Sequence, residues 1–85
     1  MNTLLRTLYD YAFEHRMPLC LEEEPSYREC GAATERQLRE LRRLLDGEGA
    51  RRLEDYVDDM ELLHTLKLEA MFQAGLSVGL ELSRR

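Results

Sequence analysis

The sequence predicts a single all-α domain that spans residues 1–85 and contains three helices. Apolar residues recur at steps of three and four over most of the chain, which is the period of an amphipathic helix. Two prolines, Pro18 and Pro25, and a pair of glycines near residue 48 divide the chain into three such periodic segments. Apolar and polar residues alternate around Leu19 and Leu21, as they do in a strand. No second strand is predicted to pair with this stretch, so no sheet is expected.

The first helix is expected over residues 2–16. Asn2 or Thr3 can cap its N-terminus, because both side chains accept a hydrogen bond from a free backbone N–H. Met17 is biased away from helical geometry because it precedes a proline, so we expect an ordered loop over residues 17–24. The apolar positions that follow the helical period, with tyrosines beside them, are Leu4, Leu5, Leu8 and Ala12.

The second helix is expected over about residues 25–46. Ser26 and Glu29 have the spacing of a capping box, in which each side chain bonds the backbone N–H of the other residue. Gly31 leaves a later start open, because the same spacing occurs again from Thr34. One stripe of the predicted helix contains Tyr27, Cys30, Thr34, Leu38, Leu41 and Leu45.

Gly47 and Gly49 interrupt the helical pattern, and both tolerate positive φ, which predicts a tight reversal. The third helix is expected over about residues 50–83. At 1.5 Å per residue it is about 50 Å long, against about 30 Å for the second helix and 22 Å for the first. We therefore expect the second helix to pack antiparallel on the first half of the third, and the first helix to fold over the second half.

The third helix changes character along its length. Over residues 53–63 apolar and acidic residues fall on opposite sides, so we expect one buried face there. Beyond residue 66 apolar and small residues cover most of the circumference, which is more than the first helix can shelter. The glycines there stand four residues apart, a spacing that lets another helix backbone approach closely. The residues expected to form an interface are Leu68, Met71, Phe72, Gly75, Leu76, Gly79 and Leu80.

We expect this surface to bind a second copy of the chain, as a C2 homodimer or a higher homo-oligomer. The alternative is that the small residues receive only the first helix of the same chain, and the two arrangements are compatible. The leading functional hypothesis is thus a noncatalytic, homo-oligomeric protein–protein interaction module. The hairpin is free to contact a further protein partner, which the sequence does not identify.

A motif near the C-terminus points to a family. Phe72 lies three positions before Gly75, and Gly79 follows four positions later. Further features are the opening MNTLLRTLY, the hairpin around Gly47, and Glu69, Leu76, Val78, Leu80 and Glu81. Together they resemble a family of short, uncharacterised helical proteins of anaerobic Firmicutes, in which Leu76 tends to be phenylalanine. The resemblance implies a helical fold and a bacterial cytosolic origin, and it implies no activity.

Composition bears on compartment and partners. Cys20 and Cys30 form no CxxC pair, and the first residues are charged and amphipathic rather than a secretory signal, so we expect a reducing, cytoplasmic location. No run of 18 apolar residues occurs, which argues against a membrane span. The net charge of −5 repels phosphate backbones and makes nucleic acid an unfavoured partner.

No nucleophile elbow, phosphate loop or zinc-ligand quartet occurs, so we expect neither an enzyme nor a cofactor. One alternative is a metal-binding helical bundle across a dimer. Glu61 and His64 have the i, i+3 spacing of di-iron bundles, although the site also needs carboxylates from a facing helix. The candidate carboxylates are Glu29, Glu35 and Glu40. The acidic run of residues 54–61 could hold Mg²⁺, as carboxylates do in helical pyrophosphatases. The second carboxylate motif of those enzymes is missing, so a solvated acidic face is the expected interpretation.

A second alternative is a small regulator that contacts nucleic acid through arginines near the hairpin. Arginines near a helix C-terminus also stabilise it electrostatically, and Glu35 and Arg39 form a favourable i, i+4 pair, which explains the cluster without a ligand. The residues of this cluster are Arg36, Arg39, Arg42, Arg43, Arg51 and Arg52.

Overall fold

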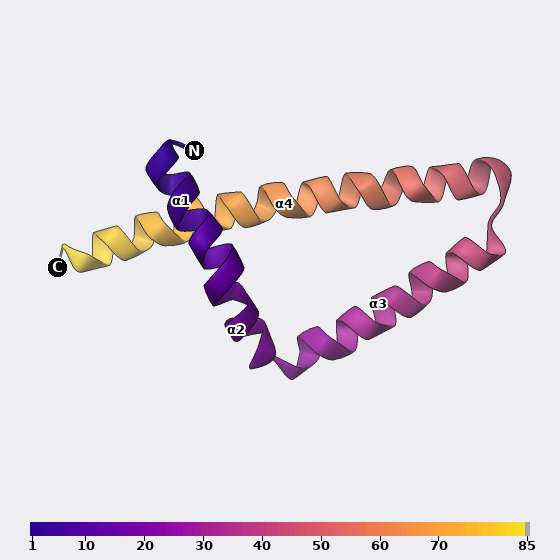
Figure 1. Cartoon of the computed structure of the whole chain (residues 1–85), viewed down its shortest axis with the longest axis horizontal. Helices are drawn as coiled ribbons and strands as arrows, with labels where there is room; N and C mark the ends of the chain where they lie inside the picture. The colour runs from indigo at the N-terminus through magenta and orange to yellow at the C-terminus, as the bar shows by residue number, and fades with distance from the viewer. Residues whose placement is uncertain (85) are drawn as a thin grey trace.

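The computed structural model describes residues 1–84 and confirms the all-α fold class. Helix α1 (Thr3–Tyr11), the π-helix η1 (Ala12–Arg16) and α2 (Met17–Glu22) follow one another without a break. Helix α3 (Pro25–Leu44) and the long α4 (Gly47–Ser83) complete the chain. The described residues contain no strand, and the helices outline a triangle in which α4 is the longest side (Figure 1).

The loop expected over residues 17–24 is wrong, because the chain stays helical to Glu22. The difference arises at Pro18, whose missing N–H normally breaks an α-helix. Here the preceding turn widens to π geometry, in which the Met17 N–H bonds the Ala12 carbonyl five residues earlier, and this wider turn accommodates Pro18 at the start of α2. The N-terminal cap is as predicted, since the Leu5 N–H donates to Asn2 Oδ1 at 2.8 Å.

Helix α3 begins at Pro25, one of the two expected positions, and the later start after Gly31 is not used. Its cap differs from the expected capping box. The Ser26 N–H donates to the Glu24 side chain at 3.3 Å, so Glu24 is the capping residue. The helix ends at Leu44, two residues earlier than expected.

The reversal between α3 and α4 lies at the expected glycines but is tighter than predicted. Gly47 has a φ of +53°, a left-handed conformation in which a side chain is strained, and α4 already begins at this residue. Gly49 is helical and lies against the Leu45 side chain. The third helix therefore starts three residues before the predicted Ala50.

The helices touch at the corners of the triangle. Helix α1 crosses the C-terminal half of α4, where Arg6 pairs with Glu69 (Figure 1). Helices α3 and α4 come close next to the turn and then diverge, so the expected packing along the first half of α4 is largely missing. The radius of gyration is 17.3 Å, whereas a compact domain of this length has about 12 Å.

The core is small and centres on Tyr9, which is only 8% exposed. Leu5 and Ala12, one turn before it and one turn after it, are half-buried on the same face of the N-terminal helix. Leu4 and Leu8 also follow the helical period of this segment, but both are exposed. Their exposure follows from the ring of Tyr9, which occupies the contact with α4 and turns these two leucines toward solvent.

Candidate interaction surface

The α1–α4 junction is the best-packed contact of the molecule. The Tyr9 ring meets Phe72 edge-on, with 5.5 Å between ring centroids, and stacks against Phe13 at 5.9 Å. The Arg6 guanidinium lies 5.4 Å from the centre of the Tyr9 ring and donates a 3.2 Å hydrogen bond to Glu69 Oε1. Aromatic pairing, a cation–π contact and an ion pair therefore combine at one crossing of two helices.

The structure divides the predicted interface into two groups. Leu68, Phe72 and Leu76 are half-buried, on the part of α4 that α1 crosses. Met71 and Leu80 remain 71% and 53% exposed. The half-buried members are thus partly covered within the chain, and Met71 and Leu80 are not.

The two predicted interface glycines, Gly75 and Gly79, are exposed, and nothing lies within 4 Å of a Cβ built at either position. Helix α1 therefore does not use the small residues for a close approach within the protomer. Of the two arrangements expected from the sequence, close packing of α1 on the glycines is not observed.

The exposed side of α4 carries a row of apolar residues that was not predicted from the sequence. Its members are between 42% and 71% exposed, although the first half of α4 was expected to have one buried face. In that half only Gly49, Ala50, Leu53 and Val57 are half-buried, because α3 diverges from it beyond the turn. The helical period, followed through the whole helix instead of in two halves, could have revealed the row. We call this set the outer row: Tyr56, Met60, Leu63, Met71, Val78 and Leu82.

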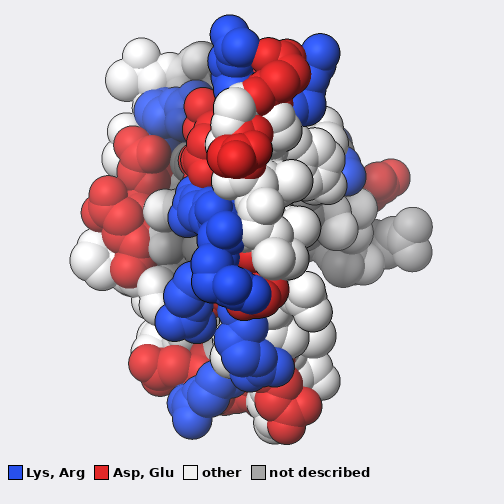
Figure 2. Space-filling view, turned by 90° about the vertical axis from the view of Figure 1, so that its right-hand side faces the viewer, with Lys and Arg blue, Asp and Glu red and all other residues white. Residues whose placement is uncertain are grey.

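Charged side chains are segregated on the surface. Arginines form a band that descends from the hairpin along α3, bordered by carboxylates (Figure 2). Of the predicted arginine cluster, Arg42 pairs with Glu54, Arg43 with Glu40 and Arg51 with Glu48. The other three, Arg36, Arg39 and Arg52, are exposed and form no ion pair within residues 1–84.

One of these ion pairs bridges two helices. Arg42 on α3 donates hydrogen bonds of 2.7 and 3.1 Å to the two carboxylate oxygens of Glu54 on α4. The hydrogen bond from Arg42 lowers the pKa of Glu54 below its ordinary value, and the hydrogen bond to Glu54 raises the pKa of Arg42. Within α3, the hydrogen bond to Glu40 likewise raises the pKa of Arg43.

The proposed metal ligands Glu61 and His64 are both exposed on α4. In the described part of the chain, no three His, Cys, Asp or Glu side chains converge as metal ligands would. The candidate partners on α3, Glu29, Glu35 and Glu40, are also exposed. The chain by itself brings these predicted ligands to no common point.

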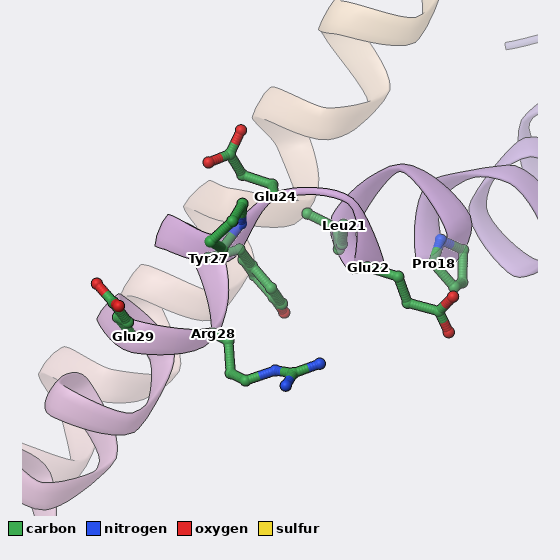
Figure 3. A pocket seen from close by; sticks show the side chains of 8 residues that line it. Pro18, Leu21, Glu22, Glu24, Tyr27, Arg28 and Glu29 are labelled. Atoms are coloured by element: carbon green, nitrogen blue, oxygen red, sulfur yellow. The ribbon is translucent and has the colours of Figure 1, made fainter.

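The corner between α2 and α3 holds an open hollow of about 700 Å³. Figure 3 shows Tyr27, Arg28 and Glu22 on its concave side, whereas the carboxylates of Glu24 and Glu29 point away. A smaller, mainly apolar hollow of about 270 Å³ lies under the α1–α4 junction, where Phe13, Met17 and Met71 line it. The smaller hollow has no convergent polar groups of the kind that characterise a small-molecule site.

Cys20 and Cys30 are exposed free thiols. None of the described helices combines the length and the apolar character that crossing a membrane requires.

Comparisons with known proteins reach the family level. A family model described as a family of unknown function (DUF6809) matches residues 1–83, which is nearly the whole chain. No curated protein and no solved structure matches.

Proposed function

The chain belongs to this family of unknown function, and we propose that it acts as a noncatalytic, homo-oligomeric helical module for protein–protein interaction. The observation that carries the proposal is the amount of surface that one chain exposes. Its accessible surface is 7521 Å², whereas a compact monomer of 10.0 kDa exposes about 5200 Å². The excess is roughly 2300 Å² per chain.

The excess surface matches the requirement of a stable dimer. If two copies bury this excess, the interface removes roughly 4600 Å², within the range of about 2000 to 5000 Å² for obligate homodimers. The exposed side chains include nine large apolar ones on α4, which are costly to leave in water. A second copy is the partner that we propose for this area.

The proposal places the protein in the cytoplasm. Its support is the chemistry of Cys20 and Cys30, which are exposed, unpaired thiols that persist in a reducing compartment. The noncatalytic role is supported by the arrangement of the polar residues. Glu69, Glu54 and Glu40 are engaged in ion pairs with Arg6, Arg42 and Arg43, and no metal-ligand cluster forms within residues 1–84.

Size-exclusion chromatography with light scattering tests the proposal. We expect a mass of about twice 10.0 kDa at micromolar concentration. A mass of 10.0 kDa at about 100 μM would show that the exposed surface does not bind a second copy.

Gly75→Leu tests whether the glycines belong to the interface. A side chain at Gly75 meets only open space within the protomer, so the variant should keep its helical circular dichroism and lose the dimer mass. Gly31→Leu on α3 is the matched control, because its surroundings are equally open. If Gly75→Leu keeps the wild-type mass, Gly75 lies outside the interface.

A further inference from the structure

The outer row has a regular spacing. From Tyr56 to Leu82 its positions follow steps of four, three, four, four, three, four and four, with Lys67 and Ala74 at the two positions between the apolar members. This pattern repeats every 11 residues, or about 3.67 residues per turn, close to the period of a straight α-helix. The row therefore stays on one side of α4 over about 39 Å, and a nearly straight partner helix can follow it.

The row and the α1 junction use different parts of the α4 circumference. Leu68, Phe72 and Leu76 lie on the part of α4 that α1 crosses, and all three are half-buried. Met71 lies at the edge of this contact, where it lines the small hollow and still keeps most of its surface exposed. A second helix can therefore cover the row without displacing α1.

The distribution of charge along α4 decides the direction of the partner. Five carboxylates, all within eight residues, belong to the first half of α4: Glu54, Asp55, Asp58, Asp59 and Glu61. Of these, Asp55 and Asp59 are the two nearest the row. The second half of α4 has Lys67 against Glu69 and Glu81, and Arg84 directly follows the helix, so these charges cancel. A parallel pair would place both acidic halves at the same end of the dimer, whereas an antiparallel pair places each beside a half without net charge.

We infer that the second copy binds along the outer row with its α4 antiparallel, so that each acidic cluster meets the neutral C-terminal half of the partner helix. The inference rests on the proposed function and specifies its interface. A pairing centred between Lys67 and Met71 places Tyr56 opposite the partner's Leu82 and Met60 opposite the partner's Val78. It also places Leu63 opposite the partner's Gly75, where a large side chain meets open space.

Disulfide trapping in the full chain tests this orientation. In a background with Cys20→Ser and Cys30→Ser, two variants are prepared, one with Met60→Cys and one with Val78→Cys. Because the antiparallel pairing brings positions 60 and 78 of two copies together, an equimolar mixture should give a covalent dimer that contains one chain of each kind under mild oxidation. Intact mass identifies this product, and each variant alone should give little dimer.

Ser77→Cys in place of Val78→Cys is the matched control, since Ser77 is exposed and lies one residue off the row. Mixed with Met60→Cys, it should cross-link several-fold less. Efficient cross-linking of each variant with itself would show a parallel pair and overturn the orientation. A dimer mass without any cross-link would remove the outer row from the interface, and both results would leave self-association intact. If the variant with Cys20→Ser and Cys30→Ser has a monomer mass of 10.0 kDa in solution, the proposed function is overturned.

Discussion

Helix α4 meets the rest of the chain in two regions, and the two contacts differ in kind. At the junction with α1, Tyr9 is buried against Phe72, and Arg6 pairs with Glu69. At the hairpin with α3, the main link is an exposed pair, Arg42 and Glu54, and the helices then diverge. The comparison indicates that the one well-packed contact within the protomer is the aromatic pair of Tyr9 and Phe72, whereas many large apolar side chains of α4 remain exposed.

The largest effect is expected at the junction. Tyr9→Ala removes the one buried side chain of the contact, and we expect a loss of about 3 kcal/mol in the free energy of unfolding. Urea unfolding followed by circular dichroism measures it at a fixed protein concentration, because self-association also adds stability. Tyr11→Ala is the control, since Tyr11 is 52% exposed, and its effect should stay within about 0.5 kcal/mol. Equal losses in the two variants would show that the junction is no better packed than the surface.

The difference between the regions explains how much of the fold could be predicted. The cap at Asn2, the start at Pro25 and the turn at Gly47 depend on local signals, and the sequence carries them. The helical segment after η1 was missed because a proline was taken as a helix end. A π-turn removes that conflict at Pro18, and the residues around Pro18 carry no local signal that distinguishes a helix end from a π-turn.

The candidate site was predicted in part. The C-terminal half of α4 was identified as a surface rich in apolar and small residues, and Met71, Gly79 and Leu80 are indeed exposed there. Which side of α4 receives α1 depends on contacts such as Arg6 with Glu69, 63 residues apart, and helical periodicity holds no information about such pairs. The spacing of the outer row is present in the sequence, but its exposure follows from the divergence of α3, which helical periodicity does not show.

The second largest effect is expected on the outer row. Val78→Glu places a charge in an apolar contact opposite the acidic half of the partner helix, so the dissociation constant of the dimer should rise at least tenfold, or about 1.4 kcal/mol. Sedimentation equilibrium measures the change. Ser77→Glu adds the same charge one residue away and should change the constant less than threefold. If the two variants weaken the dimer equally, net charge and not the row controls assembly.

A smaller effect is expected at the turn that separates the two regions. Gly47→Ala forces a side chain into left-handed geometry and should cost about 1 kcal/mol in unfolding free energy, measured by thermal denaturation. Gly31→Ala lies inside α3 in open space, and there alanine should stabilise the helix by about 1 kcal/mol. The two substitutions are chemically identical and have opposite expected signs. A stabilising effect at position 47 would show that the turn adopts another conformation in solution.

The smallest effect is expected at the ion pair of the hairpin. Because the hydrogen bond from Arg42 lowers the pKa of Glu54 in the folded state, the pair stabilises the fold above the ordinary carboxyl pKa of 4.5, and this contribution is lost as the pH falls through the lowered value. The melting temperatures of wild type and Glu54→Gln should thus differ slightly at pH 7 and converge in acid. The difference should also shrink in 1 M salt, since both side chains are about half exposed. Asp55→Asn removes a neighbouring carboxylate that forms no ion pair in residues 1–84 and should show no such convergence. A Glu54→Gln difference that is independent of pH would show that the ionised carboxylate of Glu54 does not contribute to the stability of the hairpin.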